Sequence, residues 1–123
     1  MLAVAKHFSG LGINANVITK WASTDQDFIM SEVDSNKKIN IFNLGSSKSI
    51  KKTRYVDRSS NTRVFESYEL PNEEDYLTSP QEIKKLVGAK KIEFNHLVVM
   101  DYGHNFFNHE ITQDYLDFDV PVT

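Results

Sequence analysis

Residues 96–104 are His-Leu-Val-Val-Met-Asp-Tyr-Gly-His, an unbroken apolar run that ends in polar residues. Such a run is typical of a parallel strand that is covered on both faces. Ligand sites in open α/β sheets form at the carboxyl ends of these strands. The stretch therefore predicts an α/β fold, and it places Asp101 and His104 where a ligand would bind.

The second half of the chain alternates helix and strand around this run. Ser79-Pro80-Gln81-Glu82 matches a capping box with proline at the first helical position, and Gly88 is expected to end that helix. Beyond the run, residues 110–116 are expected to form another helix, and residues 120–122 the beginning of a strand.

The first 33 residues show the same alternation. Residues 2–9 are rich in helix formers before a stop at residues 11–12, residues 16–19 are β-prone, and residues 25–33 suit an amphipathic helix. Together these segments predict a partial α/β sheet with covering helices, within a single domain that spans residues 1–123.

Between the two halves, residues 38–70 change to a β pattern. Residues 39–44, a run around Tyr55-Val56 and residues 62–68 are expected to form a protruding three-stranded antiparallel meander. In the last of these strands, alternation divides the side chains between two faces: Val64, Glu66 and Tyr68 on one, and Arg63, Phe65 and Ser67 on the other.

Composition and charge limit the class of protein. The 123 residues are 40% apolar and carry a net charge of −3, as expected for a globular domain rather than a disordered tail. Residues 46–63 hold six basic residues and one acidic residue, whereas residues 64–123 hold four basic and twelve acidic residues. One basic patch on an acidic body disfavours a nucleic-acid partner, because the acidic half would repel a polyanion.

The absence of cysteine excludes disulfides, thiolate metal sites and a thiol nucleophile, and it favours a reducing cytoplasm. No run of 18 apolar residues is present, so no membrane-spanning segment is expected. Asp101, His104, His109 and Glu110 lack the spacing that brings metal ligands onto one face, so no metal site is predicted.

Lys52 and Arg54 are two residues apart in a predicted strand and therefore project to one face. There an ammonium and a guanidinium would converge on a phosphate group. The alternative is a basic strand that serves solubility or discourages edge pairing. Asp101, at the end of an apolar strand, needs a partner that offsets its desolvation, such as a lysine, a metal or a substrate hydroxyl. Its alternative role is to cap the following turn.

Two segments carry a family resemblance: residues 51–57 continued by residues 64–68, and residues 97–104. Together they resemble the ribokinase-like (PfkB) carbohydrate kinases, above all the heptose-phosphate kinase type, in which a K-T-R-F-V-D lid strand precedes a strand-end D-[FY]-G-H-G. Asn105 stands where that motif has its last glycine. The family's Gly-Gly sugar-binding turn and its G-A-G-D segment, which supplies the anion hole and the catalytic aspartate, have no counterpart in this sequence.

The resemblance implies the sugar-binding portion of an ATP-dependent sugar or sugar-phosphate kinase, with residues 38–70 as a lid over the sugar. Lys52, Arg54, Asp101 and His104 are then the substrate-binding residues, and no catalytic residue is expected in this chain. ATP and Mg²⁺ are implied for the complete family member and are not expected for this chain alone, because phosphoryl transfer needs the missing groups. A homodimer through the lid is expected, because free strand edges invite pairing.

Two alternatives remain open. The basic segment 46–63 would in one case bind the phosphates of a nucleic acid, with Tyr55 and Phe65 stacking on bases. In the other case the chain is an inert dimerisation module that binds no ligand. Salt-dependent binding to single-stranded DNA or RNA separates the first alternative from the kinase interpretation.

Overall fold

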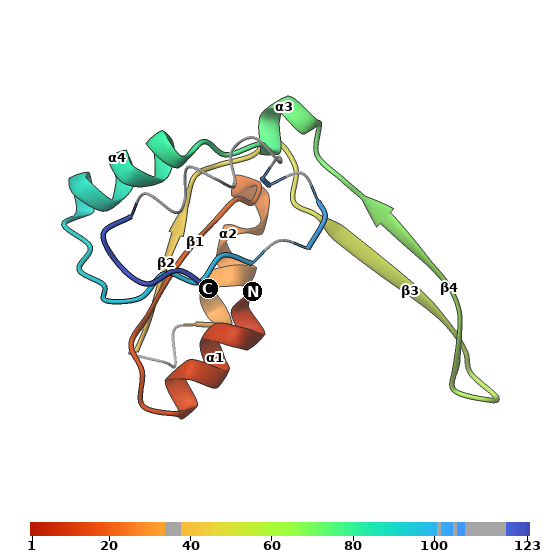
Figure 1. The fold of residues 1–123 in the computed structure, drawn as a ribbon. Helices are drawn as coiled ribbons and strands as arrows, with labels where there is room; N and C mark the ends of the chain where they lie inside the picture. The colour runs from red at the N-terminus through yellow and green to blue at the C-terminus, as the bar shows by residue number, and fades with distance from the viewer. Residues whose placement is uncertain (34–37, 101, 105, 108–117) are drawn as a thin grey trace.

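The structure of the chain, a computed structural model, describes residues 1–33, 38–100, 102–104, 106–107 and 118–123 (Figure 1). The described residues have a mixed α/β architecture with two small two-stranded sheets. One sheet lies among helices and forms the body of the molecule, and the other extends away from the body (Figure 1). The α/β class expected from the sequence is confirmed.

Two parallel strands, β1 (Ala15–Thr19) and β2 (Ile39–Asn43), form the sheet of the body. Between them the chain forms a 3-10 helix at Ser23–Asp25 and helix α2 (Gln26–Ser31). Parallel strands require a crossover connection of this kind, and a helix usually supplies it.

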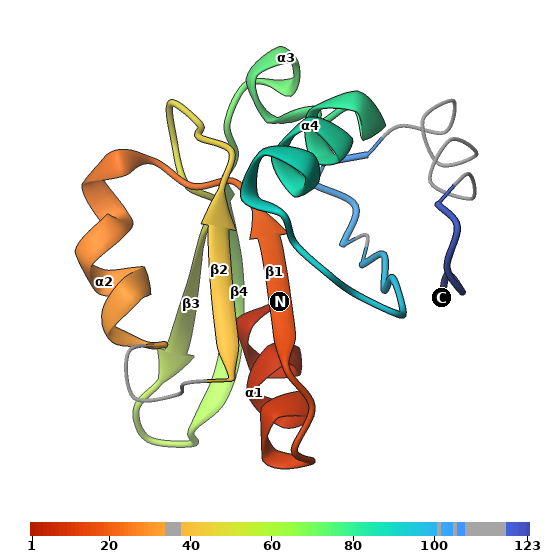
Figure 2. The ribbon, with the colours of Figure 1, turned by 90° about the vertical axis from the view of Figure 1, so that its left-hand side faces the viewer.

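Helix α1 (Leu2–Gly10) lies beside β1 (Figure 2). The buried core between helix and strands consists of small or branched apolar residues: Ala5, Val17, Val33 and Ile39. The helix ends where the sequence predicts, since the N–H of Ile13 donates to the carbonyl oxygen of Phe8 and Gly12 has a φ of +88°. The expected order of helix, strand and helix is confirmed.

The expected three-stranded meander at residues 38–70 is wrong in its first strand. Ile39–Asn43 pairs in parallel with β1 and belongs to the body, so the antiparallel part has only two strands. The connections explain the difference. β2 follows a helical crossover from β1, and residues 44–50 form an irregular connection instead of the tight turn that would fold β2 onto the next strand.

The two antiparallel strands, β3 (Lys51–Asp57) and β4 (Thr62–Glu69), form a hairpin that protrudes from the body (Figure 1). Its turn is held by the Asp57 carboxylate, which accepts hydrogen bonds from the backbone N–H of Ser59 and from the hydroxyls of Ser59 and Ser60. All but one side chain of each strand are exposed. The hairpin therefore presents two solvent-facing surfaces.

Helices α3 (Glu73–Tyr76) and α4 (Pro80–Lys90) follow the hairpin. The predicted capping box of α4 is confirmed: the Ser79 hydroxyl accepts the N–H of Glu82, and the Glu82 carboxylate accepts the N–H of Ser79. These contacts satisfy two of the backbone donors that a helix N-terminus leaves open.

The predicted helix stop at Gly88 is wrong. Helix α4 continues to Lys90 and ends with Lys91 in the left-handed conformation, at a φ of 50°. A glycine within a helix costs only about 1 kcal/mol relative to alanine, and the following Ala89 and Lys90 are good helix formers.

The apolar run at residues 96–100 does not form the expected strand of the body sheet. It makes one parallel bridge, between Leu97 and Val122, with hydrogen bonds from Leu97 and Val99 to residues 121–123. A cavity of about 890 Å³ separates the run from β1. Val98, which lines this cavity, is 42% exposed instead of covered on both faces.

Three expectations lie outside the described residues: the helix at residues 110–116 and the positions of Asp101 and His109. Within the described ranges, no helix is both long enough and apolar enough to cross a membrane.

Candidate functional site

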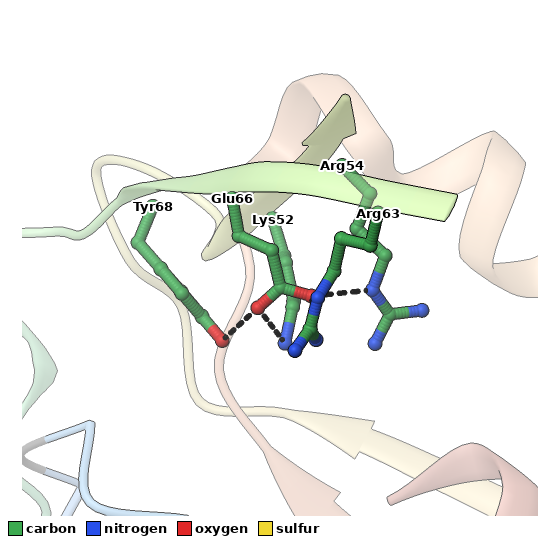
Figure 3. A network of polar contacts seen from close by, with 5 residues as sticks. All are labelled: Lys52, Arg54, Arg63, Glu66 and Tyr68. Carbon is green, nitrogen blue, oxygen red and sulfur yellow. Dashed lines mark hydrogen bonds and ion pairs between the residues drawn. The ribbon is translucent and has the colours of Figure 1, made fainter. Parts of the chain in front are cut away.

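Lys52 and Arg54 lie on one face of β3, as their spacing predicts (Figure 3). Across the hairpin, Lys52 is opposite Tyr68 and Arg54 is opposite Glu66. Directly opposed side chains of an antiparallel pair are close enough to interact. The register therefore adds an acid and an aromatic ring to the two predicted bases.

The Glu66 carboxylate is the centre of this group. Its Oε1 accepts hydrogen bonds from Arg54 Nε and Arg63 Nη1, both at 2.8 Å. Its Oε2 lies 2.9 Å from Lys52 Nζ and accepts the Tyr68 hydroxyl at 3.4 Å. These five residues, Lys52, Arg54, Arg63, Glu66 and Tyr68, are called the cationic cluster (Figure 3).

Arg63 reaches the cluster because β4 contains a bulge. Tyr55 is opposite Phe65, but the next residue, Val56, is opposite Arg63, so Val64 is an extra residue in the ladder. A bulge changes the direction in which the following side chains point. The strict alternation that assigned Arg63 to the face of Phe65 is therefore wrong, and three bases share one carboxylate.

Tyr68 connects the cluster with the body. Its ring centroid lies 4.8 Å from Lys52 Nζ and 5.7 Å from the centroid of the His104 imidazole, with the two rings tilted by 44°. Three of the four residues predicted to bind substrate, Lys52, Arg54 and His104, are thus linked through Tyr68 and Glu66. The fourth, Asp101, lies outside the described residues.

Pairing shifts the ionisation of the cluster. The hydrogen bond from Lys52, followed by those from the two arginines, lowers the pKa of the Glu66 carboxyl to about 2. Hydrogen bonding with Tyr68 and Glu66 raises the pKa of the Lys52 ammonium. At neutral pH the cluster therefore carries three positive charges and one negative charge.

The carboxylate is shielded, whereas the arginines are open to solvent. The side chain of Glu66 is 16% exposed, and those of Arg54 and Arg63 are 61% and 62% exposed. A guanidinium has five N–H donors, and each contact with Glu66 uses one of them. A carboxylate with so low a pKa is a poor base, so the arrangement suits the binding of an anion rather than proton transfer.

The opposite face of the hairpin is aromatic. Tyr55 and Phe65 stack with centroids 4.1 Å apart and planes 15° apart. The two residues are 46% and 54% exposed. Because each ring covers one face of the other, less aromatic surface is left for stacking on nucleic-acid bases than two separate rings would offer.

Other features of the described chain offer less chemistry. No group of three or more His, Asp or Glu side chains is arranged to hold a metal ion in the part of the chain that the structure describes. The cavity beside β1 has a mainly apolar lining, to which no member of the cationic cluster contributes. The cationic cluster is therefore the candidate site.

Comparison with protein-family models, with curated proteins and with solved structures finds no match. The resemblance to ribokinase-like kinases stays a prediction that rests on the two motifs in the sequence.

The sequence does not single out Arg63, Glu66 or Tyr68 as site residues. For Glu66 and Tyr68 the sequence does hold a signal. Along the chain, Glu66 and Arg54 are equally distant from Ser60, and so are Tyr68 and Lys52, so a hairpin that turns at Ser60 places the members of each pair opposite each other. Arg63 has no such signal, because its direction depends on the bulge.

Proposed function

We propose that the chain is the sugar-binding portion of an ATP-dependent sugar or sugar-phosphate kinase of the ribokinase-like type. In this function the hairpin is the lid, and the cationic cluster faces the substrate. The supporting observation is that Lys52, Arg54 and His104, which come from two separate motifs, meet around Glu66 and Tyr68.

Each of these groups has a chemical role in the proposal. Lys52 supplies a point charge and Arg54 a planar set of donors for the oxygens of the substrate. His104, beside Tyr68, and Asp101, three residues before it, belong to the sugar side of the site. ATP and Mg²⁺ act in the complete enzyme, and we expect no phosphoryl transfer from this chain alone.

The same proposal includes a homodimer through the hairpin. A lone two-stranded hairpin is only marginally stable in water, and its free edges invite pairing with another chain. Near the turn, the aromatic face leaves Tyr55 and Phe65 exposed. A second copy that packs on this face would cover both rings. The proposed location is the cytoplasm, in keeping with the absence of cysteine.

Isothermal titration of the purified 123-residue chain tests the sugar-binding function. Hexoses, hexose phosphates and heptose phosphates are titrated against the wild type and Arg54→Ala. The proposal expects binding of at least one sugar compound and a clear loss in the variant. If no sugar compound binds and single-stranded DNA binds instead with a steep salt dependence, the nucleic-acid alternative is correct.

A further inference from the structure

Three bases of the cationic cluster are held in contact with one carboxylate. Glu66 Oε1 pairs with both arginines at 2.8 Å, and Oε2 lies 2.9 Å from Lys52 Nζ. Like charges repel one another, and one carboxylate neutralises only one of the three. The cluster therefore concentrates a net charge of +2 on one face of the hairpin.

The bulge in β4 brings more positive charge to this face than is needed to pair with the Glu66 carboxylate. In a regular strand Arg63 would lie on the aromatic face, and Glu66 would pair with Lys52 and Arg54 alone. The bulge instead brings a third base to a carboxylate that already has two. Bulges are common beside functional sites, where they redirect a side chain. Glu66 already has two ion-pair partners in Lys52 and Arg54, so ion pairing within the hairpin does not require Arg63.

The two arginines keep N–H donors available for an oxyanion. Glu66 fixes one N–H group of each guanidinium, and both side chains are more than half exposed. Guanidinium groups bind phosphate oxygens through two parallel hydrogen bonds. A phosphate monoester presents three oxygens and a charge of about −1.5 to −2 at pH 7. That charge matches the cluster, whereas the hydroxyls of a free sugar carry none.

We propose that the cationic cluster is a phosphate subsite, in which Arg63 is a third phosphate-binding residue and Glu66 is a positioning residue that holds the bases together. This inference rests on the proposed function for the sugar part of the ligand. It adds Arg63 and Glu66 to the phosphate site that Lys52 and Arg54 are expected to form.

The alternative to a positioning role is that the Glu66 carboxylate competes with the ligand for the three bases. The two roles give opposite signs for Glu66→Gln. A competitor would leave the bases free when its charge is removed, and phosphate would bind more tightly. A positioning residue would leave three mutually repelling bases without their common partner, and phosphate would bind more weakly.

The test is isothermal titration of the 123-residue chain with inorganic phosphate, glucose 6-phosphate, sedoheptulose 7-phosphate and glucose. We expect Arg63→Ala to weaken binding of the phosphate compounds about tenfold, because one charge-assisted contact is lost. The matched control is Arg58→Ala, which removes an arginine from the turn of the same hairpin. It should change affinity less than about twofold.

For the positioning role, Glu66→Gln is compared with Glu69→Gln. Glu69 is on the same strand and pairs with Lys51 at 3.2 Å, outside the cluster. We expect Glu66→Gln to weaken phosphate binding about tenfold and Glu69→Gln to leave it unchanged. Circular dichroism of each variant shows whether the hairpin and the body keep their secondary structure, so that a folding defect is recognised separately.

The outcomes distinguish this inference from the proposed function. If the sugar phosphates bind no better than inorganic phosphate, while Arg63→Ala and Glu66→Gln weaken both, the phosphate subsite stands and the sugar-kinase function is wrong. If glucose binds as tightly as its phosphate and Arg63→Ala has no effect, the subsite is wrong and sugar binding stands. Tighter phosphate binding by Glu66→Gln overturns the positioning role, and failure of every probe overturns both proposals.

Discussion

The backbone N–H of Ser47 donates to Oδ2 of Asp75 at 2.8 Å and so joins the two connections that lead into and out of the hairpin. The same oxygen accepts the hydroxyls of Ser46 and Ser47. Lys20, at the carboxyl end of β1, donates through Nζ to the carbonyl oxygens of Asp75 and Leu77. The base of the hairpin is thereby attached to the body at the edge where β1 ends.

Asp75→Asn is expected to loosen this attachment. An amide lacks the charge that strengthens three hydrogen bonds to one oxygen, so the two legs of the hairpin should separate more readily. Hydrogen exchange is the measurement: amides of residues 44–50 and 70–77 should exchange faster, while those of β1 and β2 stay protected. Asp25→Asn, in the 3-10 helix of the body, is the control. Equal exchange in the wild type and Asp75→Asn would contradict the role of this carboxylate.

The Glu66 carboxyl makes stability depend on pH. Its pKa is about 2 in the folded chain, against 4.5 for an unperturbed glutamate, because Lys52 and the two arginines bind the ionised form. Since the folded pKa is the lower one, this contribution is complete above about pH 4.5 and is lost as the pH falls towards 2. Denaturation by urea between pH 6 and 2.5 measures it. The wild type should lose more stability over this range than Glu66→Gln, whereas Glu69→Gln should behave like the wild type.

Arg54 provides the sharpest test of recognition by a planar donor group. Arg54→Ala should weaken binding of a sugar phosphate by roughly ten- to a hundredfold, because charge-assisted hydrogen bonds are lost. Arg54→Lys keeps the charge but not the fork, so it should restore only part of the affinity. The unfolding midpoint should move little, because exposed ion pairs contribute about 1 kcal/mol or less. Titration calorimetry and thermal melting measure the two effects, and full recovery by lysine would indicate simple electrostatics.

The sequence predicts best those features that depend on neighbouring residues. The capping box at Ser79 and Glu82 is a local pattern, and it forms as predicted. The shared face of Lys52 and Arg54 also follows from a two-residue period. Helix α1 ends at a glycine-containing stop for the same reason, since the conformation of Gly12 is a local requirement.

Features that depend on distant partners are harder to predict. The sequence of β2 is compatible with either kind of neighbour, and its parallel pairing with β1 is set by the crossover through α2. Arg63 changes face because of one extra residue in β4, which no alternation of residue types reveals. Residues 96–100 have the composition of a buried strand, but they do not pair with β1 and make one bridge, from Leu97 to Val122.

The capping box of α4 gives a stability prediction that is independent of function. Ser79→Ala removes the hydroxyl that accepts the Glu82 N–H at 3.2 Å. Loss of such a cap typically costs about 0.5–2 kcal/mol, so the unfolding free energy should fall by about 1 kcal/mol. Ser79→Asp should retain most of it, because an aspartate is an equally good N-cap. Urea denaturation measures both variants, and an unchanged alanine variant would show that the cap contributes nothing.

The proposed dimer of two hairpins should depend on the aromatic face that Tyr55 and Phe65 form. Phe65 is 54% exposed and stacks on Tyr55. Burying such a side chain contributes about 1.5–3 kcal/mol, so Phe65→Lys should weaken a dimer through this face at least about tenfold. Phe28→Lys is a matched control, because Phe28 is 71% exposed on α2 in the body. Sedimentation velocity at high micromolar concentration measures the association. A monomeric wild type, or equal dissociation by both variants, would show that the hairpin is not the dimer interface.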